Sequence, residues 1–243
     1  MPAGSAVYFI ADAHLGAEPE SREAPRRRRL HDFLTSLPGR ASALYIVGDL
    51  FDFWFEWGAA IPRRHFETLA ALRDVRRAGI EVHYLNGNHD FWLGPFLSRE
   101  LGLVTHDRAV TLETQGHRIW MHHGDGLVGG DLGYRILKRV IRSPAAIALY
   151  RVLHPDIGWW LAHRVSRWSR VSREDRPPDT DRLWREIAEP RFAAGFDTVM
   201  VGHFHLVLER RDGPRTLFVL GDWIDQFTAV RLEDGVFTLE RHA

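Results

Sequence analysis

The chain has 243 residues, 45% of them hydrophobic, so it can bury the core of one α/β domain and is not disordered. It contains no cysteine, which excludes disulfides and thiolate metal sites and leaves oxygen and imidazole ligands for any metal. Its 32 basic and 32 acidic side chains balance, so a uniformly basic surface is not indicated and we expect no nucleic-acid partner.

The first ninety residues alternate between strand and helix. Short runs of apolar residues predict strands, and apolar residues at helical spacing predict helices between them. The predicted strands are 7–10, 44–47 and 81–85, and the predicted helices are 21–37 and 62–78. Strands that alternate with helices in this way are typical of a parallel sheet, and we therefore expect an α/β fold, which some definitions class as α+β.

The second half changes character. A predicted hairpin around Gln115-Gly116 is followed by three predicted helices, which Ser143-Pro144 and His154-Pro155 separate. The hairpin strands are 109–114 and 117–121, the three helices are 131–141, 145–153 and 157–171, and a further helix and strand follow at 181–194 and 197–201. We expect the tail to form a small antiparallel sheet of four strands, at 206–209, 216–220, 227–232 and 236–240.

The N-terminus does not combine a basic start, an apolar stretch and a small-residue cleavage site. No run of about 18 apolar residues appears either. We therefore expect a cytoplasmic protein.

Five short polar blocks each follow an apolar run that predicts a strand. Their Asp, Asn and His side chains are hard oxygen and borderline nitrogen donors, which a fold can gather around a pair of cations. The blocks are Asp12-Ala13-His14, Gly48-Asp49, Gly87-Asn88-His89-Asp90, His122-His123-Gly124-Asp125 and Gly202-His203-Phe204-His205. Each block alone also fits an ordinary turn or a solvated strand. Their joint occurrence after strands favours a two-metal phosphoesterase site.

The spacing within the blocks suggests individual roles. Residues two apart in an extended strand end face the same way, so Asp12 with His14, and His203 with His205, are predicted to be paired ligands. Asp49 is predicted to bridge two cations about 3.5–4 Å apart. Asn88 would add an amide oxygen and His123 would complete the second metal position. His89 would stabilise developing charge or protonate the leaving oxygen.

These blocks resemble the signature of the calcineurin-like metallophosphoesterase superfamily, complete and in order from residue 7 to residue 205. Within it, the chain resembles the UDP-2,3-diacylglucosamine pyrophosphohydrolases of lipid A synthesis. The segments that carry this narrower resemblance are Phe9 to Leu15, Leu44 to Phe51, Asp90-Phe91-x-Leu93-Gly94, and His123-Gly124-Asp125 followed by Asp131-x-Gly133-Tyr134.

The resemblance implies a four-layer α/β-β/α sandwich, a single domain of residues 1–243 with a helical cap inserted at 127–180. It also implies two divalent cations, with Mn preferred and Mg, Fe, Co or Zn as alternatives. The implied ligands are Asp12, His14, Asp49 and His205 for one cation, and Asp49, Asn88, His123 and His203 for the other. The implied catalytic residues are Asp49, Asn88 and His89, and the residues expected to orient the ligands are Asp52, Asp90 and Asp125.

In the family that the chain resembles, water attacks the α-phosphorus of UDP-2,3-diacylglucosamine, giving UMP and 2,3-diacylglucosamine 1-phosphate at the membrane surface. The candidate substrate contacts are Asn88, His89, Asp131, Tyr134, Ser166 and Arg170. His89 departs from the best-known branch, which has Arg there, although other branches carry His. Since imidazole titrates near neutrality, activity should depend more on pH.

The segment 135–182 has eleven Lys or Arg residues against five Asp or Glu, together with many apolar side chains such as Trp159 and Trp160. It is predicted to wrap acyl chains and rest on the inner face of the cytoplasmic membrane, or simply to pack the cap onto the core. The alternative functions are a phosphoesterase for a phosphoprotein, cyclic nucleotide or nucleic acid, and a non-enzymatic scaffold of the same fold.

Overall fold

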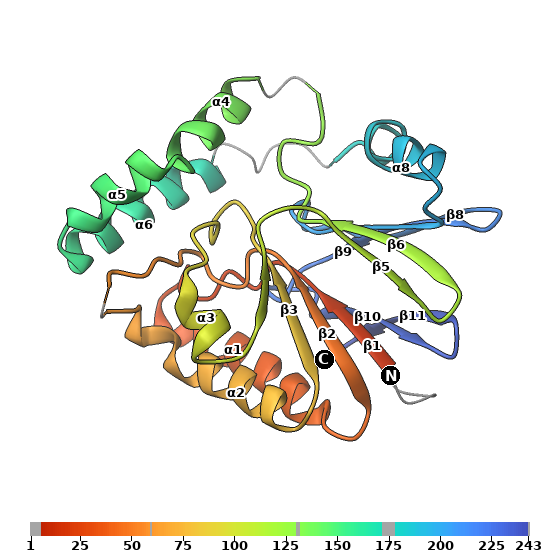
Figure 1. Cartoon of the computed structure of the whole chain (residues 1–243), viewed down its shortest axis with the longest axis horizontal. Coiled ribbons are helices and arrows are strands. Elements are labelled where there is room, and N and C mark those ends of the chain that lie inside the picture. Colours follow the sequence, from red (N-terminus) through yellow and green to blue (C-terminus); the bar gives the residue numbers. More distant parts are fainter. Residues whose placement is uncertain (1–5, 59, 130–131, 172–177, 243) are drawn as a thin grey trace.

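The computed structural model describes residues 6–58, 60–129, 132–171 and 178–242, with the side chains of 132–135, 137 and 165–171 left aside. Two β-sheets stack face to face in these residues, and helices cover both outer faces (Figure 1). The expected α/β sandwich of four layers is confirmed. None of the helices in the described ranges has the length and apolar character needed to cross a membrane.

The first sheet has six strands in the order β11-β10-β1-β2-β3-β4, with β1 to β4 parallel and β10 antiparallel to β1. Its strands are β1 (Ala6–Ile10), β2 (Ala41–Val47), β3 (Glu81–Leu85), β4 (Val104–His106), β10 (Thr228–Glu233) and β11 (Val236–Arg241). Side chains alternate across β1. Tyr8 and Ile10 enter the core beneath the helices, and Val7 and Phe9 enter the core between the sheets.

The second sheet has five strands in the order β5-β6-β7-β9-β8, in which β6, β7 and β9 are parallel. Its strands are β5 (Val110–Thr114), β6 (His117–His122), β7 (Thr198–Val201), β8 (Val207–Asp212) and β9 (Arg215–Leu220). The carboxyl ends of β6 and β7 carry two of the polar blocks, just as those of β1, β2 and β3 carry the other three. The strand ends of both sheets can therefore supply one shared site.

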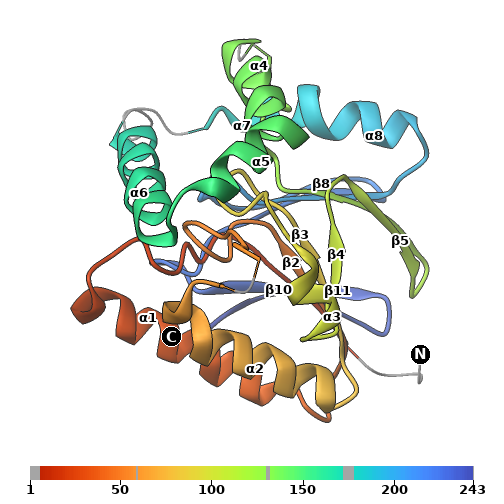
Figure 2. The same cartoon turned by 60° about the vertical axis from the view of Figure 1, so that its left-hand side comes forward.

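Helices form the two outer layers and a separate group. The layer that covers the first sheet consists of α1 (Glu20–Ser36), the short turn η1 (Arg63–His65), α2 (Phe66–Arg77) and α3 (Pro95–Arg99). The layer that covers the second sheet consists of α7 (Thr180–Leu183), the π-helical turn η2 (Trp184–Ala188) and α8 (Glu189–Ala193). The remaining helices, α4 (Leu132–Ile141), α5 (Pro144–Val152) and α6 (Pro155–Val171), are called the cap helices below. They stand outside the sandwich (Figures 1 and 2).

The prediction of a small antiparallel sheet in the tail is wrong. The strands β8 and β9 belong to the second sheet, where β9 pairs in parallel with β7, whereas β10 and β11 extend the first sheet beside β1. A strand buried on both faces belongs inside a sheet, and β9 is buried over Thr216 to Leu220. β10 pairs with β1, which lies at the opposite end of the described chain, and a local pattern cannot specify such a partner. The short α3 and β4 were also not predicted.

Candidate metal centre

The polar blocks converge where the strands of both sheets end. Asp12, Asp49 and Asn88 follow β1, β2 and β3 of the first sheet. His123 follows β6 of the second sheet, and His203 follows β7. The two ligand loops of the first sheet are joined by main-chain hydrogen bonds from Asp12 to Gly48 at 3.2 Å and from His14 to Asp49 at 2.9 Å.

One group of possible ligands consists of Asp12, His14 and His205, whose ligand atoms all lie within 4.8 Å of one another. Oδ1 of Asp12 lies 3.5 Å from Nε2 of His14 and 3.8 Å from Nε2 of His205. The His14 and His205 rings stack at 5.1 Å. Three donors from two sheets thus face a common point.

A second group consists of Asp49, His123 and His203. Nε2 of His123 lies 3.1 Å from Oδ2 of Asp49, 3.1 Å from Oδ1 of Asn88 and 3.3 Å from Nδ1 of His203. The same Oδ2 of Asp49 is 3.6 Å from Nε2 of His14 in the first group. Asp49 therefore stands between the two groups, as a bridging carboxylate must.

The hydrogen bonds of His123 select its tautomer. Its Nδ1 lies 3.0 Å from the carbonyl oxygen of Val47, which can only accept, so Nδ1 carries the proton. In the neutral ring Nε2 then presents a lone pair to the cluster, the arrangement that metal-binding histidines use.

The electrostatics of the cluster favour positive charge. Burial opposes protonation of His123, but the carboxylates, Asp49 foremost, outweigh it and raise its pKa to about 10. Burial likewise opposes charge on His14, yet Asp12 and Asp52 hold its pKa well above its ordinary value. The pKa of Asp49, although burial would raise it, is held well below its usual range by His123 and its neighbours. Surroundings that favour protonation of two buried imidazoles also favour a divalent cation in place of those protons.

Buried polar atoms and a close-fitting glycine further support a metal centre. Oδ1 of Asp12 and both ring nitrogens of His14 are buried without a hydrogen-bond partner among the described residues, which is costly unless a ligand satisfies them. A Cβ on Gly87 would lie 2.0 Å from Oδ1 of Asp49. Only glycine lets this backbone approach the Asp49 carboxylate so closely. The residues present fit a divalent metal centre.

The backbone at the ligand positions is not the extended strand end that the spacing suggested. Five of the eight non-glycine residues with positive φ in the described ranges are ligand candidates: Asp12 (57°), His14 (44°), Asp49 (51°), His203 (70°) and His205 (48°). Left-handed residues occur sparsely and cluster at functional sites. The side chains do converge, but through tight turns beyond the strands, a geometry that alternation along a strand could not reveal.

The three acidic residues expected to orient the ligands occupy different positions. The Asp90 carboxylate accepts hydrogen bonds from the Asp49 and Gly87 amides at 3.2 and 2.8 Å, and from the Tyr84 hydroxyl. It therefore joins the loop after β2 to the loop after β3. Asp52 lies 3.7 Å from Nδ1 of His14. Asp125 forms an ion pair of 2.6 Å with Lys138 of α4.

His89 lies beside the first group. Its backbone amide donates to Oδ1 of Asp49 at 2.8 Å, and its Nδ1 faces the Asp52 carbonyl and carboxylate at 3.2 and 3.4 Å. Its ring meets that of His14 edge-on at 4.7 Å, and one of its nitrogens lies within 4.8 Å of ligand atoms of His14 and Asp49.

Sequence reasoning missed Asp222, which follows β9. Its Oδ2 lies 3.5 Å from Nδ1 of His205, and its Oδ1 accepts the amide hydrogens of residues 224–226 at 2.9–3.0 Å. A signal existed, because Gly221-Asp222 follows a strand just as Gly48-Asp49 does. The structure also brings His163 and Arg64 to the edge of the site, with no motif to mark either.

The expected substrate contacts in the cap cannot be placed. Asp131 lies outside the described residues, and so do the side chains of Tyr134, Ser166 and Arg170.

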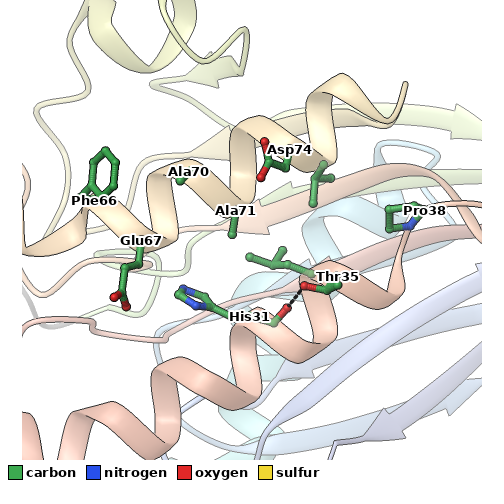
Figure 3. A pocket seen from close by; sticks show the side chains of 10 residues that line it. His31, Thr35, Pro38, Phe66, Glu67, Ala70, Ala71 and Asp74 are labelled. Atoms are coloured by element: carbon green, nitrogen blue, oxygen red, sulfur yellow. Dashed lines mark hydrogen bonds between the residues drawn. The ribbon is translucent and has the colours of Figure 1, made fainter.

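A groove of about 450 Å³ lies elsewhere, between α1 and α2 (Figure 3). His31 and Thr35 line one wall, and Phe66, Glu67 and Asp74 line the other. None of the ligand candidates lines this groove, so it is not part of the metal centre.

Comparison with known proteins gives consistent relatives. The chain is 32% identical to UDP-2,3-diacylglucosamine hydrolase of Porphyromonas gingivalis, over 95% of each chain. It is 31% identical to the protein of the same name from Pseudomonas paraeruginosa, over 93% of this chain and 95% of the other, and 30% identical to that from Ectopseudomonas mendocina, over 93% and 94%. No family model matches the chain.

Proposed function

Because the chain belongs to the UDP-2,3-diacylglucosamine hydrolase family, we propose that it cleaves the pyrophosphate of UDP-2,3-diacylglucosamine by water attack on the α-phosphorus. The products are UMP and 2,3-diacylglucosamine 1-phosphate, an intermediate of lipid A synthesis. The position of one Asp49 oxygen between two groups of ligand-type side chains carries this proposal, since it suits a two-metal phosphoesterase.

The donor set consists of carboxylate, amide and imidazole, which can bind Mn, Mg, Fe, Co or Zn. Among these we propose Mn. Two divalent cations would supply charge neutralisation at the phosphate and a water of lowered pKa. The residues that would hold one cation are Asp12, His14, Asp49 and His205, and those that would hold the other are Asp49, Asn88, His123 and His203.

His89 is placed to act on the phosphate. Because its Nδ1 faces the Asp52 carbonyl, this nitrogen carries a proton and the ring orientation is fixed. The rest of the ring lies beside His14 and Asp49. We assign it stabilisation of developing charge or proton donation to the leaving phosphate oxygen, with Asn88 at its side. In the cap, Asp131, Tyr134, Ser166 and Arg170 are proposed substrate contacts.

The cap helices present the apolar surface that a lipid substrate requires. Of the ten large hydrophobic side chains exposed in the described part of the chain, seven lie on these helices: Ile136, Val140, Leu149, Val152, Ile157, Trp160 and Leu161. Packing onto the core does not account for side chains that face solvent, and grouped exposed apolar residues mark interaction surfaces.

Arg139, Arg151 and Arg164 are exposed on the same helices. Basic and apolar side chains together favour an anionic bilayer. We assign the cap helices a peripheral contact with the inner face of the cytoplasmic membrane, where the diacyl substrate resides.

The decisive experiment incubates the purified protein with UDP-2,3-diacylglucosamine and Mn and measures UMP. We expect UMP release that Asp49→Ala abolishes, because that variant loses the bridging carboxylate. A phosphopeptide and a cyclic nucleotide serve as competing substrates. Faster turnover of either one, or near-normal UMP release by the variant, would overturn the assignment.

A further inference from the structure

The inner side of α6 lies against the loops that carry the metal centre. Trp159 and His163 are one helical turn apart and so share a face. The Trp159 ring lies 5.6 Å from that of Phe53 and 5.9 Å from that of His65, while Trp160 is 58% exposed on another side of the helix. This packing brings His163 to the edge of the site.

His163 lies between a cation and an anion of the sandwich. Its Nδ1 is 3.5 Å from Oδ2 of Asp52, and its Nε2 is 3.4 Å from Nη1 of Arg64. Arg64 also donates to the Gly16 carbonyl at 3.2 Å, and its guanidinium lies 5.1 Å from the centre of the Trp159 ring. One arginine therefore contacts both α6 and the loop that follows His14.

The contact with Arg64 indicates which nitrogen of His163 carries a proton. A guanidinium can only donate, so Nε2 accepts from Arg64 and the proton resides on Nδ1. The Nδ1–H side of the ring faces Asp52 at the ion-pair distance of 3.5 Å.

Asp52 lies between His163 and two histidines of the metal centre, His89 and His14. Its carboxylate faces Nδ1 of His89 at 3.4 Å and Nδ1 of His14 at 3.7 Å, and it is 1% exposed. Three imidazoles from three parts of the chain meet one buried carboxylate. The contact from His163 of α6 therefore reaches the same carboxylate that faces His89 and His14.

We propose that His163 is a positioning residue for the hydrolytic reaction: through Asp52 it fixes the orientation of His89 and His14, and so couples docking of α6 to the geometry of the metal centre. The hydrolytic reaction in this inference rests on the proposed function, whereas the contacts of His163 do not depend on it. Partners that orient metal-binding side chains typically contribute a factor of about 10–100 to activity or metal affinity.

The test compares His163→Ala with His163→Asn, since an asparagine amide N–H can take the place of the Nδ1–H that faces Asp52. We expect His163→Ala to lower kcat about tenfold on both the diacyl substrate and bis(4-nitrophenyl) phosphate, with KM for the aryl ester unchanged. His163→Asn should restore most of kcat. His154→Ala is the matched control, because His154 is 67% exposed and directly precedes the same helix.

A second readout does not depend on activity. In metal-free protein labelled with ¹⁵N-histidine, His163→Ala should shift the imidazole signals of His14 and His89, and His163→Asn should return them toward their original positions. Unchanged signals would overturn the proposal. So would a loss confined to KM for the diacyl substrate, because a residue that only docks the cap would produce it. A protein that hydrolyses the aryl ester but releases no UMP would refute the proposed function while leaving the role of His163 intact.

Discussion

The ligand candidates hold conformations that ordinary residues avoid. A left-handed backbone costs a non-glycine residue about 1–2 kcal/mol, and Asp12, His14, Asp49, His203 and His205 all adopt one. Such strain persists only where the surroundings impose it. Here the loops after β1 and β2 are joined by main-chain hydrogen bonds, including Leu15 to Leu50 at 2.9 Å. The backbone hydrogen bonds of these loops thus hold the ligand side chains toward one centre.

His89 offers a direct test of the chemistry. We expect His89→Asn to lower kcat about 100-fold, because an amide cannot donate a proton to the leaving oxygen, while leaving bound metal unchanged. Steady-state rates and metal analysis of the same samples would measure both. His83→Asn, a change to a half-buried histidine of β3, is the control. Wild-type turnover by His89→Asn would remove this residue from the mechanism.

His65 should make stability depend on pH. Burial, aided by Arg64, lowers its pKa to about 3, and its Nε2 is buried without a hydrogen-bond partner among the described residues. The unfolded chain, with an ordinary pKa of about 6.5, takes up a proton that the folded chain refuses. The stability that the neutral ring provides is full above pH 6.5 and declines as pH falls toward 3, by about 2 kcal/mol at pH 5.

Urea unfolding of wild type and His65→Leu at pH 7 and pH 5 would measure this effect. The variant should lose about 2 kcal/mol less than wild type between the two pH values. His154→Leu, at an exposed position, should behave as wild type. Parallel curves for wild type and His65→Leu would contradict the prediction.

The local sequence pattern predicted where helices and strands occur better than it predicted which strands pair. A helix is predicted over 62–78 because Phe66, Leu69, Leu72 and Val75 recur at helical spacing. The structure has α2 at 66–77, where Leu69, Leu72 and Val75 are buried and Phe66 is exposed. The prediction that the four tail strands form one small sheet is wrong, because β8 and β9 join the second sheet, where β9 pairs with β7, and β10 joins β1 of the first, which local patterns do not specify. The same holds for the site: Asp12 and His14 stand in a local motif, whereas Asp222 and His163 are recognisable only once their neighbours are known.

A substitution on the exposed side of the cap helix α6 should weaken membrane contact without affecting folding. Trp160 is 58% exposed, so we expect Trp160→Ser to weaken binding to phosphatidylglycerol vesicles about tenfold without lowering the melting temperature. Co-sedimentation would measure the binding. Val236→Ser is the control, since Val236 is 63% exposed on β11, outside the cap. Equal losses in both variants would show that the cap helices have no special role in adsorption.

The metal centre draws its side chains from both sheets. Asp12, His14, Asp49 and Asn88 follow strands of the first sheet, and His123, His203 and His205 follow strands of the second. Bound cations would therefore hold the two layers together. Ligands that bind only the folded state stabilise it by about 4 kcal/mol at a thousandfold excess over Kd.

Removal of metal should consequently lower the melting temperature by about 10 °C, given about 2–4 °C for each kcal/mol in a domain of this size. Differential scanning calorimetry with Mn and with a chelator would measure the shift. Asp49→Ala should show a much smaller response, because it lacks the bridging carboxylate. A chelator effect of the same size in wild type and variant would place the stabilising metal elsewhere.

The order of the strands also constrains biosynthesis. Because β10 completes the first sheet beside β1, the second edge of β1 stays unpaired until β10 has been synthesised. A nascent polypeptide on the ribosome therefore exposes that edge while the whole segment between β1 and β10 is translated. The hairpin of β10 and β11 is the segment whose emergence closes that edge against aggregation.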